Sequence, residues 1–163
     1  MRTVIGVMGS GRPIGEAERA LAHELGAMIA TRGWVLLTGG TAAGVMDAAS
    51  QGAHEAGGLV IGVLRSDRGD EASPHLDVAI RTGMGDARNV INVLSSDVVI
   101  ALPGGTGTIS EVALALKSGK TVIACGWDPG APLRTAGGDL LLLASSAEEA
   151  IALVGSTIAR RRH

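Results

Sequence analysis

The sequence predicts an α/β protein with a parallel sheet between two layers of helices. Short apolar runs alternate along the chain with stretches of helical periodicity, as expected when parallel strands are connected by helices. The predicted strands are almost wholly apolar, which is typical of strands buried on both faces. Glycine-rich loops follow three of these runs. Together these observations favour a Rossmann-like, doubly wound sheet in a three-layer α/β/α arrangement, with residues 1–163 forming one ligand-binding domain.

Composition supports this fold class and excludes some functions. Hydrophobic residues make up 46% of the chain, but there is no Phe or Tyr and there are only two Trp. The core must therefore consist of Val, Ile, Leu, Ala and Met, and the 25 glycines suit close packing of helices on a sheet. A net charge of −2 argues against general nucleic-acid binding.

The first part of the chain contains two strand–helix units and a third strand. Residues 3–8 form a short apolar run, and 17–29 place Ala, Leu, Met and Ile on one helical stripe. Residues 34–37 predict the second strand, 44–56 a helix rich in small residues, and 59–64 the third strand.

The middle of the chain begins with a polar segment, 65–75, which we predict to be a surface loop and the best candidate for a lid. Alternating apolar residues in 76–80 indicate a fourth strand. Asp86 is a plausible N-cap for a helix that continues to Leu94, and 97–102 form the fifth strand.

The last part begins with a helix that follows the third glycine loop and contains residues 112–116. We then expect a strand at 121–125, a loop at 127–137 and a short strand at 139–143. A capping box at Ser146 starts a helix to about residue 158, and 160–163 form a solvated basic tail. Cys125 lies in an apolar run, which favours a buried core residue over a nucleophile, and a single cysteine excludes an internal disulfide.

The segment from Leu102 to Glu111 is the strongest candidate for a binding site. It has the pattern of strand, tight loop and helix, with the loop sequence Pro103-Gly104-Gly105-Thr106-Gly107-Thr108. Free amides in the first turn of a helix, the helix dipole and the threonine hydroxyls all favour a phosphate. The structural alternative is a simple strand-to-helix turn in which Thr108 and Glu111 form a capping box.

Two earlier loops resemble this one. The first contains Gly9, Ser10 and Arg12; its glycine spacing is not that of a dinucleotide fingerprint, and Arg12 fits a phosphate contact or a solvent-exposed position equally well. The second contains Gly39, Gly40 and Thr41 and leads to a helix that includes Met46. Because the carboxyl ends of parallel strands share one edge, all three loops are expected to meet there.

Arg88 and Asn89 occupy the first turn of the predicted third helix. An arginine there opposes the preference set by the helix dipole, and such a local misfit points to another purpose. The alternative is a surface salt bridge.

The stretch Pro103–Glu111 resembles the PGGxGTxxE signature of the Lonely Guy proteins, and Thr38-Gly39-Gly40 with Gly44–Asp47 resembles their second glycine loop. Arg88 matches the arginine that pairs in those enzymes with the motif glutamate, here Glu111. The resemblance implies nucleoside 5′-monophosphate phosphoribohydrolase activity, with Glu111 and Arg88 as the catalytic residues.

Other features are more similar to a sister branch, the molybdenum cofactor carrier proteins. Lonely Guy enzymes have Arg-Lys where this chain has Arg88-Asn89, and they continue well beyond the sixth strand. The resemblance implies a dimeric or tetrameric protein that binds the phosphate-bearing pterin without turnover.

The preferred hypothesis is therefore a molybdenum cofactor carrier, with the phosphoribohydrolase as the alternative. A third class, a DNA-uptake-related binding module, is disfavoured by the charge and by the lack of stacking aromatics. The ligand is expected to be the cofactor as cargo, or a nucleoside monophosphate, with no metal ligated directly by the protein. Without a signal peptide or a membrane-length apolar run, we expect a cytoplasmic protein. The high apolar fraction and the helix from Val90 to Leu94 favour a homodimer or homotetramer.

Overall fold

Apolar runs rich in Val, Ile and Leu form the strands of one sheet. The computed structural model describes residues 1–161. Seven strands pair in the order β4-β3-β2-β1-β5-β6-β7, and every pair is parallel. Their bounds are β1 Val4–Met8, β2 Val35–Thr38, β3 Val60–Leu64, β4 Val78–Arg81, β5 Val98–Ala101, β6 Thr121–Cys125 and β7 Leu141–Ala144.

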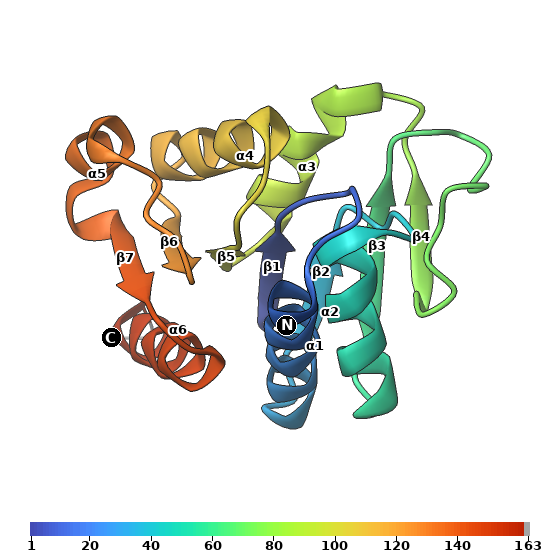
Figure 1. Cartoon of the computed structure of the whole chain (residues 1–163), viewed down its shortest axis with the longest axis horizontal. Coiled ribbons are helices and arrows are strands. Elements are labelled where there is room, and N and C mark those ends of the chain that lie inside the picture. The colour runs from blue at the N-terminus through green and yellow to red at the C-terminus, as the bar shows by residue number, and fades with distance from the viewer. Residues whose placement is uncertain (162–163) are drawn as a thin grey trace.

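Helices cover both faces of this sheet. Figure 1 shows α1, α2 and α6 on one side of the strands and α3, α4 and α5 on the other. The bounds are α1 Glu16–Thr31, α2 Gly44–Glu55, α3 Arg88–Ser95, α4 Thr106–Lys117, α5 Ala131–Gly137 and α6 Ala147–Arg161, with single 3-10 turns η1 Gly85–Ala87 and η2 Gly138–Leu140. The predicted three-layer, Rossmann-like architecture is confirmed.

Two apolar cores lie on the two faces, because successive strand residues point in opposite directions. In β5, Val98 and Ile100 belong to the core that includes Leu25 of α1, whereas Val99 packs in the core that includes Val112 of α4. All of these side chains are fully buried. The continuous apolar runs in the sequence thus reflect a sheet that is covered on both sides.

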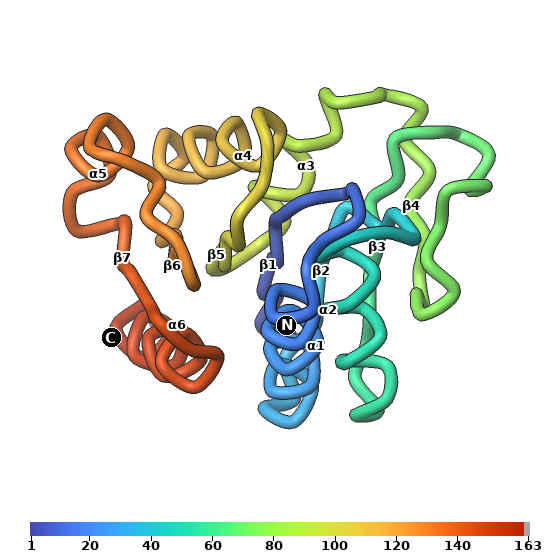
Figure 2. The backbone as a smooth tube through the Cα atoms, viewed as in Figure 1, coloured from blue at the N-terminus to red at the C-terminus, as the bar shows by residue number. Residues whose placement is uncertain are grey.

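Strand order reverses between β1 and β5, and this position determines where the site forms. Met8 at the end of β1 is in register with Ala101 at the end of β5, and the Leu102 amide donates to the Met8 carbonyl at 2.9 Å. The loops that follow β1 and β5 therefore start side by side at one edge of the sheet (Figure 2). Ligands of doubly wound proteins bind at such a reversal.

Three local predictions need correction. Residues 131–137, predicted as loop, form α5, because Pro132 is tolerated in the first turn of a helix. The predicted fraying at 160–163 is wrong for Arg161, which ends α6 and donates to the Asp97 carbonyl at 2.6 Å; residues 162–163 lie outside the described part. Strand β4 begins at Val78 rather than at Leu76, and all four residues of this edge strand are exposed.

The segment 65–75 is a loop, as predicted, and its backbone is anchored to the neighbouring loop. The Ala42 amide donates to the Glu71 carbonyl at 2.9 Å, and Thr41 forms a bridge with Ala72. The Ser73 amide donates to the Gly40 carbonyl at 2.8 Å. The β2 and β3 loops are therefore joined where they leave the sheet.

Candidate functional site

A cavity of about 980 Å³ opens at the sheet edge where the strand order reverses. The loops after β1, β2 and β5 line it together with α3 and the start of α4. Twelve of the residues predicted from the sequence line this cavity, namely Gly9, Ser10, Arg12, Gly39, Met46, Arg88, Asn89, Gly105, Thr106, Gly107, Thr108 and Glu111.

Four other predicted residues are not among those that line the cavity. Gly40 and Thr41 hold the β3–β4 loop through the backbone contacts given above. Pro103 and Gly104 lie in the turn that leads to α4, and a Cβ on Gly104 would come within 2.1 Å of Thr108 Oγ1. These positions serve the packing of the loops rather than the cavity wall.

The N-terminus of α4 faces the cavity with its amides uncapped by side chains. Gly105 is the N-cap residue and provides no side-chain hydrogen bond. The capping box of the structural alternative does not form, because the helix begins at Thr106 and Thr108 is already its third residue. Glu111 therefore lies one turn into the helix and is free of a capping role. Uncapped amides with the positive end of the dipole favour an anion.

Gly105 and Gly107 border this helix start without any steric need for glycine. A Cβ built on either residue would meet no atom within 4 Å, and neither has a positive φ. Both are exposed and both line the cavity. The missing side chains leave bare backbone open to the cavity, as expected where a ligand approaches the main chain closely.

Arg88 is a buried cation in the cavity wall, with a relative exposure of 6%. Its Nη1 donates to the carbonyl oxygens of Gly39 and Val63, and Nε finds no partner within residues 1–161. A Cβ on Gly39 would lie 2.8 Å from Nη2, so glycine at this position makes room for the guanidinium. Burial lowers the pKa of the Arg88 guanidinium, although arginine stays protonated in proteins.

The expected contact between Arg88 and Glu111 is not formed, and neither is a surface salt bridge of Arg88. The ion pairs found in the described residues do not include Arg88, since the carbonyls of the β2 and β3 ends take its donors. A buried cation without a directly paired carboxylate is costly, although the nearby charge of Glu111 favours the protonated form of Arg88. An anion in the cavity would supply a direct partner.

Glu111 is also buried, with 7% exposure, and also lines the cavity. Desolvation raises the pKa of its carboxyl from the ordinary 4.5 to about 7, against the opposing effects of an Asn92 hydrogen bond and the charge of Arg88. Asn92 Nδ2 donates to Glu111 Oε1 at 2.9 Å, and Asn92 Oδ1 is buried without a partner in the described part of the chain. Near neutral pH this carboxyl can therefore accept or donate a proton.

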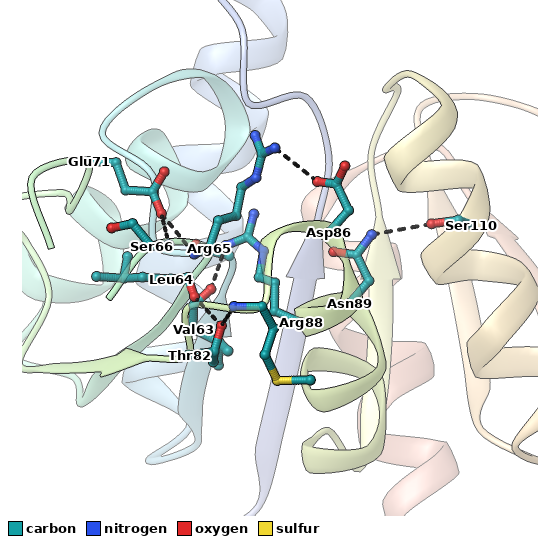
Figure 3. Close-up of polar contacts among 12 residues, drawn as sticks. Val63, Leu64, Arg65, Ser66, Glu71, Thr82, Asp86, Arg88, Asn89 and Ser110 are labelled. Carbon is teal, nitrogen blue, oxygen red and sulfur yellow. Dashed lines mark hydrogen bonds and ion pairs between the residues drawn. The ribbon is translucent and has the colours of Figure 1, made fainter. Parts of the chain in front are cut away.

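The start of α3 differs from its predicted form. Asp86 does not cap the helix, because the preceding turn η1 places Ala87 at the N-cap position. The Asp86 carboxylate instead lies 3.2 Å from Arg65 Nη2 (Figure 3). Asn89 Nδ2 donates to Ser110 Oγ at 3.2 Å and so connects α3 with α4 across the cavity wall.

Several cavity residues were not among the predicted site residues. They include Gly11, Ala87 and Ser110, which lie within the glycine loops or the start of α3, and Arg65, Val90 and Leu114. Arg65 had a usable signal, because it directly follows β3 and therefore lies at the same edge as the glycine loops. Val90 and Leu114 had none, since an apolar helical residue reads as core or interface from sequence alone.

Two kinds of feature are absent from residues 1–161. No helix is both long and apolar enough to cross a membrane. No three His, Cys, Asp or Glu side chains come together in a way that would hold a metal ion.

Burial raises the pKa of the Cys125 thiol to about 11, so this residue is protonated at neutral pH.

The parallel sheet, its strand reversal and the cavity at that point define a Rossmann-like α/β protein. Solved structures with similar sequence and fold narrow this class of protein further. A molybdenum cofactor binding protein from Rippkaea orientalis is 49% identical with a TM-score of 0.94, covering 97% of this chain and 98% of that one. The molybdenum cofactor carrier protein of Chlamydomonas reinhardtii is 45% identical with a TM-score of 0.89, covering 97% and 99%.

An enzyme is similar over a shorter stretch. The cytokinin riboside 5′-monophosphate phosphoribohydrolase of Mycobacterium tuberculosis is 38% identical over 94 residues, which are 56% of this chain and 50% of the enzyme. The chain belongs to the SLOG cluster4 family, which matches residues 2–151.

Proposed function

We propose that this chain binds a small phosphate-bearing molecule in the cavity and acts as a carrier of the molybdenum cofactor. The observation that carries the proposal is Arg88, a buried cation with no carboxylate in an ion pair with it within residues 1–161. It lines a cavity that also exposes the backbone of Gly105 and Gly107. The phosphate lies over the first turn of α4 and supplies the missing negative charge.

Similarity over nearly the full length to cofactor-binding proteins supports the carrier over the enzyme, which is matched over about half its length. Asn89 supports the same choice. Its amide is engaged with Ser110, whereas a lysine at this position would bring an additional cation to the cavity.

The test is a titration of the purified protein with molybdenum cofactor under anaerobic conditions. We expect a Kd in the low micromolar range or better, which corresponds to about −8 kcal/mol. Arg88→Leu, which replaces the buried cation by an apolar side chain, should abolish binding while the protein remains folded. Arg19→Leu, on the exposed side of α1, is the matched control and should bind as the wild type does. No binding of the cofactor or of its oxidised form would reject the proposal.

A second candidate function rests on Glu111. A carboxyl group with a pKa of about 7 beside an anion site can act as general acid or base. In N-glycosidic hydrolysis, the bond from the ribose C1′ to the base breaks, water adds at C1′, and the base leaves with a proton. Chromatography of AMP incubated with the protein distinguishes the functions: release of adenine that Glu111→Gln abolishes favours the hydrolase, and no release favours the carrier.

We also propose that the protein is a cytoplasmic homodimer or homotetramer. Val90 and Leu94 on α3 and Ile109 on α4 have exposures of 42%, 56% and 43%. The i, i+4 spacing puts the two α3 residues on one face of the helix. Light scattering on a size-exclusion column should show an oligomer for the wild type and a smaller species for Leu94→Lys.

A further inference from the structure

Arg65 lines the same cavity from the end of β3, although no sequence motif includes it. Its guanidinium extends toward the start of α3, where Nη2 lies 3.2 Å from the carboxylate of Asp86 (Figure 3). Asp86 lines the cavity as well. This pair therefore connects the two sides of the cavity at the β3 end.

The backbone of Arg65 is held in place at both its polar groups. Its amide donates to Glu71 Oε1 at 2.7 Å, and its carbonyl accepts from the Gly85 amide at 3.1 Å. The Ser66 amide donates to the same Glu71 oxygen at 3.0 Å. Only the side chain of Arg65 is left to move, so little backbone order is lost when it binds a ligand.

The contact with Asp86 is weak enough to be exchanged. The two side chains are 50% and 83% exposed. Ion pairs exposed to this degree change an equilibrium constant by no more than about fivefold. An oxyanion that meets the guanidinium with two oxygens is a stronger partner than a single exposed carboxylate contact.

The charges around the cavity favour a second oxyanion, because cationic side chains outnumber acidic ones. Among residues 1–161, three arginines line it, Arg12, Arg65 and Arg88, against the two acidic residues Asp86 and Glu111. This excess of cations is local, because the whole chain carries a net charge of −2. One phosphate over α4 and Arg88 leaves the Arg65 side of the cavity without an anion other than Asp86.

We propose that Arg65 forms a second oxyanion subsite and that Asp86 occupies it only until the ligand binds. The inference rests on the proposed function and adds to it the class of ligand: a small molecule with a phosphate at one end and a second oxyanion at the other. A carboxylate, a second phosphate or a metal oxyanion provides that chemistry.

The test measures the affinity of three simple probes, namely molybdate, inorganic phosphate and acetate, by calorimetry at low ionic strength. The proteins are the wild type, Arg65→Ala, Asp86→Asn, the double variant, and Arg68→Ala. Arg68 is an exposed arginine of the same loop that is not among the cavity residues, which makes it the matched control. The probe whose binding depends on Arg65 identifies the source of the second oxyanion.

For that probe we expect Arg65→Ala to weaken binding at least tenfold and Asp86→Asn to tighten it two- to fivefold. The double variant should equal Arg65→Ala, because Asp86 acts only by holding Arg65. A general electrostatic effect of Asp86 would instead tighten binding in both backgrounds, and that result overturns the proposal. So does a wild type that binds none of the probes, or an Arg65→Ala variant that binds all three as the wild type does.

Failure of this subsite is distinguishable from failure of the proposed function. Cofactor binding that is unaffected by Arg65→Ala would reject the subsite alone. If the protein binds an oxyanion through Arg65 but does not bind the cofactor, the molybdenum cofactor is rejected as the ligand and the oxyanion subsite stands.

Discussion

Glycines at the carboxyl edge of the sheet fall into two groups that differ in what surrounds them. A Cβ on Gly44 would come within 2.1 Å of the Ser10 carbonyl oxygen, and one on Gly104 equally close to Thr108 Oγ1. A Cβ on Gly105 or Gly107 would touch nothing within 4 Å. The first group is required for the loops to pack, whereas the second has no such role within the described chain. A glycine that lines the cavity without a steric need for glycine is therefore the better indicator of a ligand.

The largest expected effect is at Gly44. This residue has a φ of +61° and its Cβ would meet backbone, so Gly44→Ala combines strain with a clash that no side-chain movement relieves. We expect a loss of at least about 3 kcal/mol in the free energy of unfolding, measured with urea. A variant as stable as the wild type would remove the distinction between the two groups.

The next largest effect is the pH dependence of stability that Glu111 causes. This residue lies on α4, one turn after Gly107. Its carboxyl has a pKa of about 7 in the folded protein and 4.5 as its ordinary value, so the folded state holds the proton more tightly. This stabilisation is complete below pH 4.5 and is lost as the pH rises to about 7, in total about 3 kcal/mol.

Urea unfolding of the wild type and Glu111→Gln between pH 4.5 and 8 isolates this contribution. The stability of the wild type relative to the variant should fall as the pH rises through that window. A difference that stays constant would mean that Glu111 titrates normally.

Gly107→Ala is expected to have a smaller effect, in which stability rises while ligand affinity falls. Ala in the first turn of α4 should raise the free energy of unfolding by about 0.5–1 kcal/mol, because alanine loses less backbone entropy than glycine. The same methyl group would project into the cavity and weaken ligand binding at least tenfold. Urea unfolding and a cofactor titration on one preparation check both signs, and unchanged affinity would show that the ligand avoids this backbone.

The smallest effect is expected at Gly15, the N-cap of α1. A Cβ here also meets nothing within 4 Å, but Gly15 is not among the residues that line the cavity. Gly15→Ala should cost no more than about 1 kcal/mol and leave affinity within twofold of the wild type. A large loss of affinity would show that open space alone, rather than position at the cavity, marks a binding glycine.

Sequence patterns were sufficient for the sheet and for the edge at which the cavity forms. Apolar runs located the strands, and glycine loops after β1, β2 and β5 indicated where the carboxyl ends meet. Sequence patterns did not predict the contacts of Arg88. Its guanidinium donates to the carbonyl oxygens of Gly39 and Val63, which lie at the ends of β2 and β3. Nothing local to Arg88 encodes that contact.

Helix starts were the least predictable feature of the site. Thr108 and Glu111 fit a capping box by spacing, but the helix begins at Thr106, so the pattern falls inside it. The same pattern at Ser146 does lie at a helix start, where Ser146 Oγ accepts from the Glu149 amide at 3.2 Å. Spacing alone cannot distinguish the two, because the start is set by how the preceding loop leaves its strand.

The position of β1 between β2 and β5 has a consequence for when the cavity can form. Ile5 pairs with Leu36 on one side and with Val98 on the other, so the central strand acquires its second neighbour only after most of the chain has been synthesised. The cavity therefore needs residues from Val7 to Leu114, and a nascent chain that ends before β5 lacks one of its walls. A molecule that bridges the walls also holds the two halves of the polypeptide together, and loading should slow their separation and protect the protein from proteolysis.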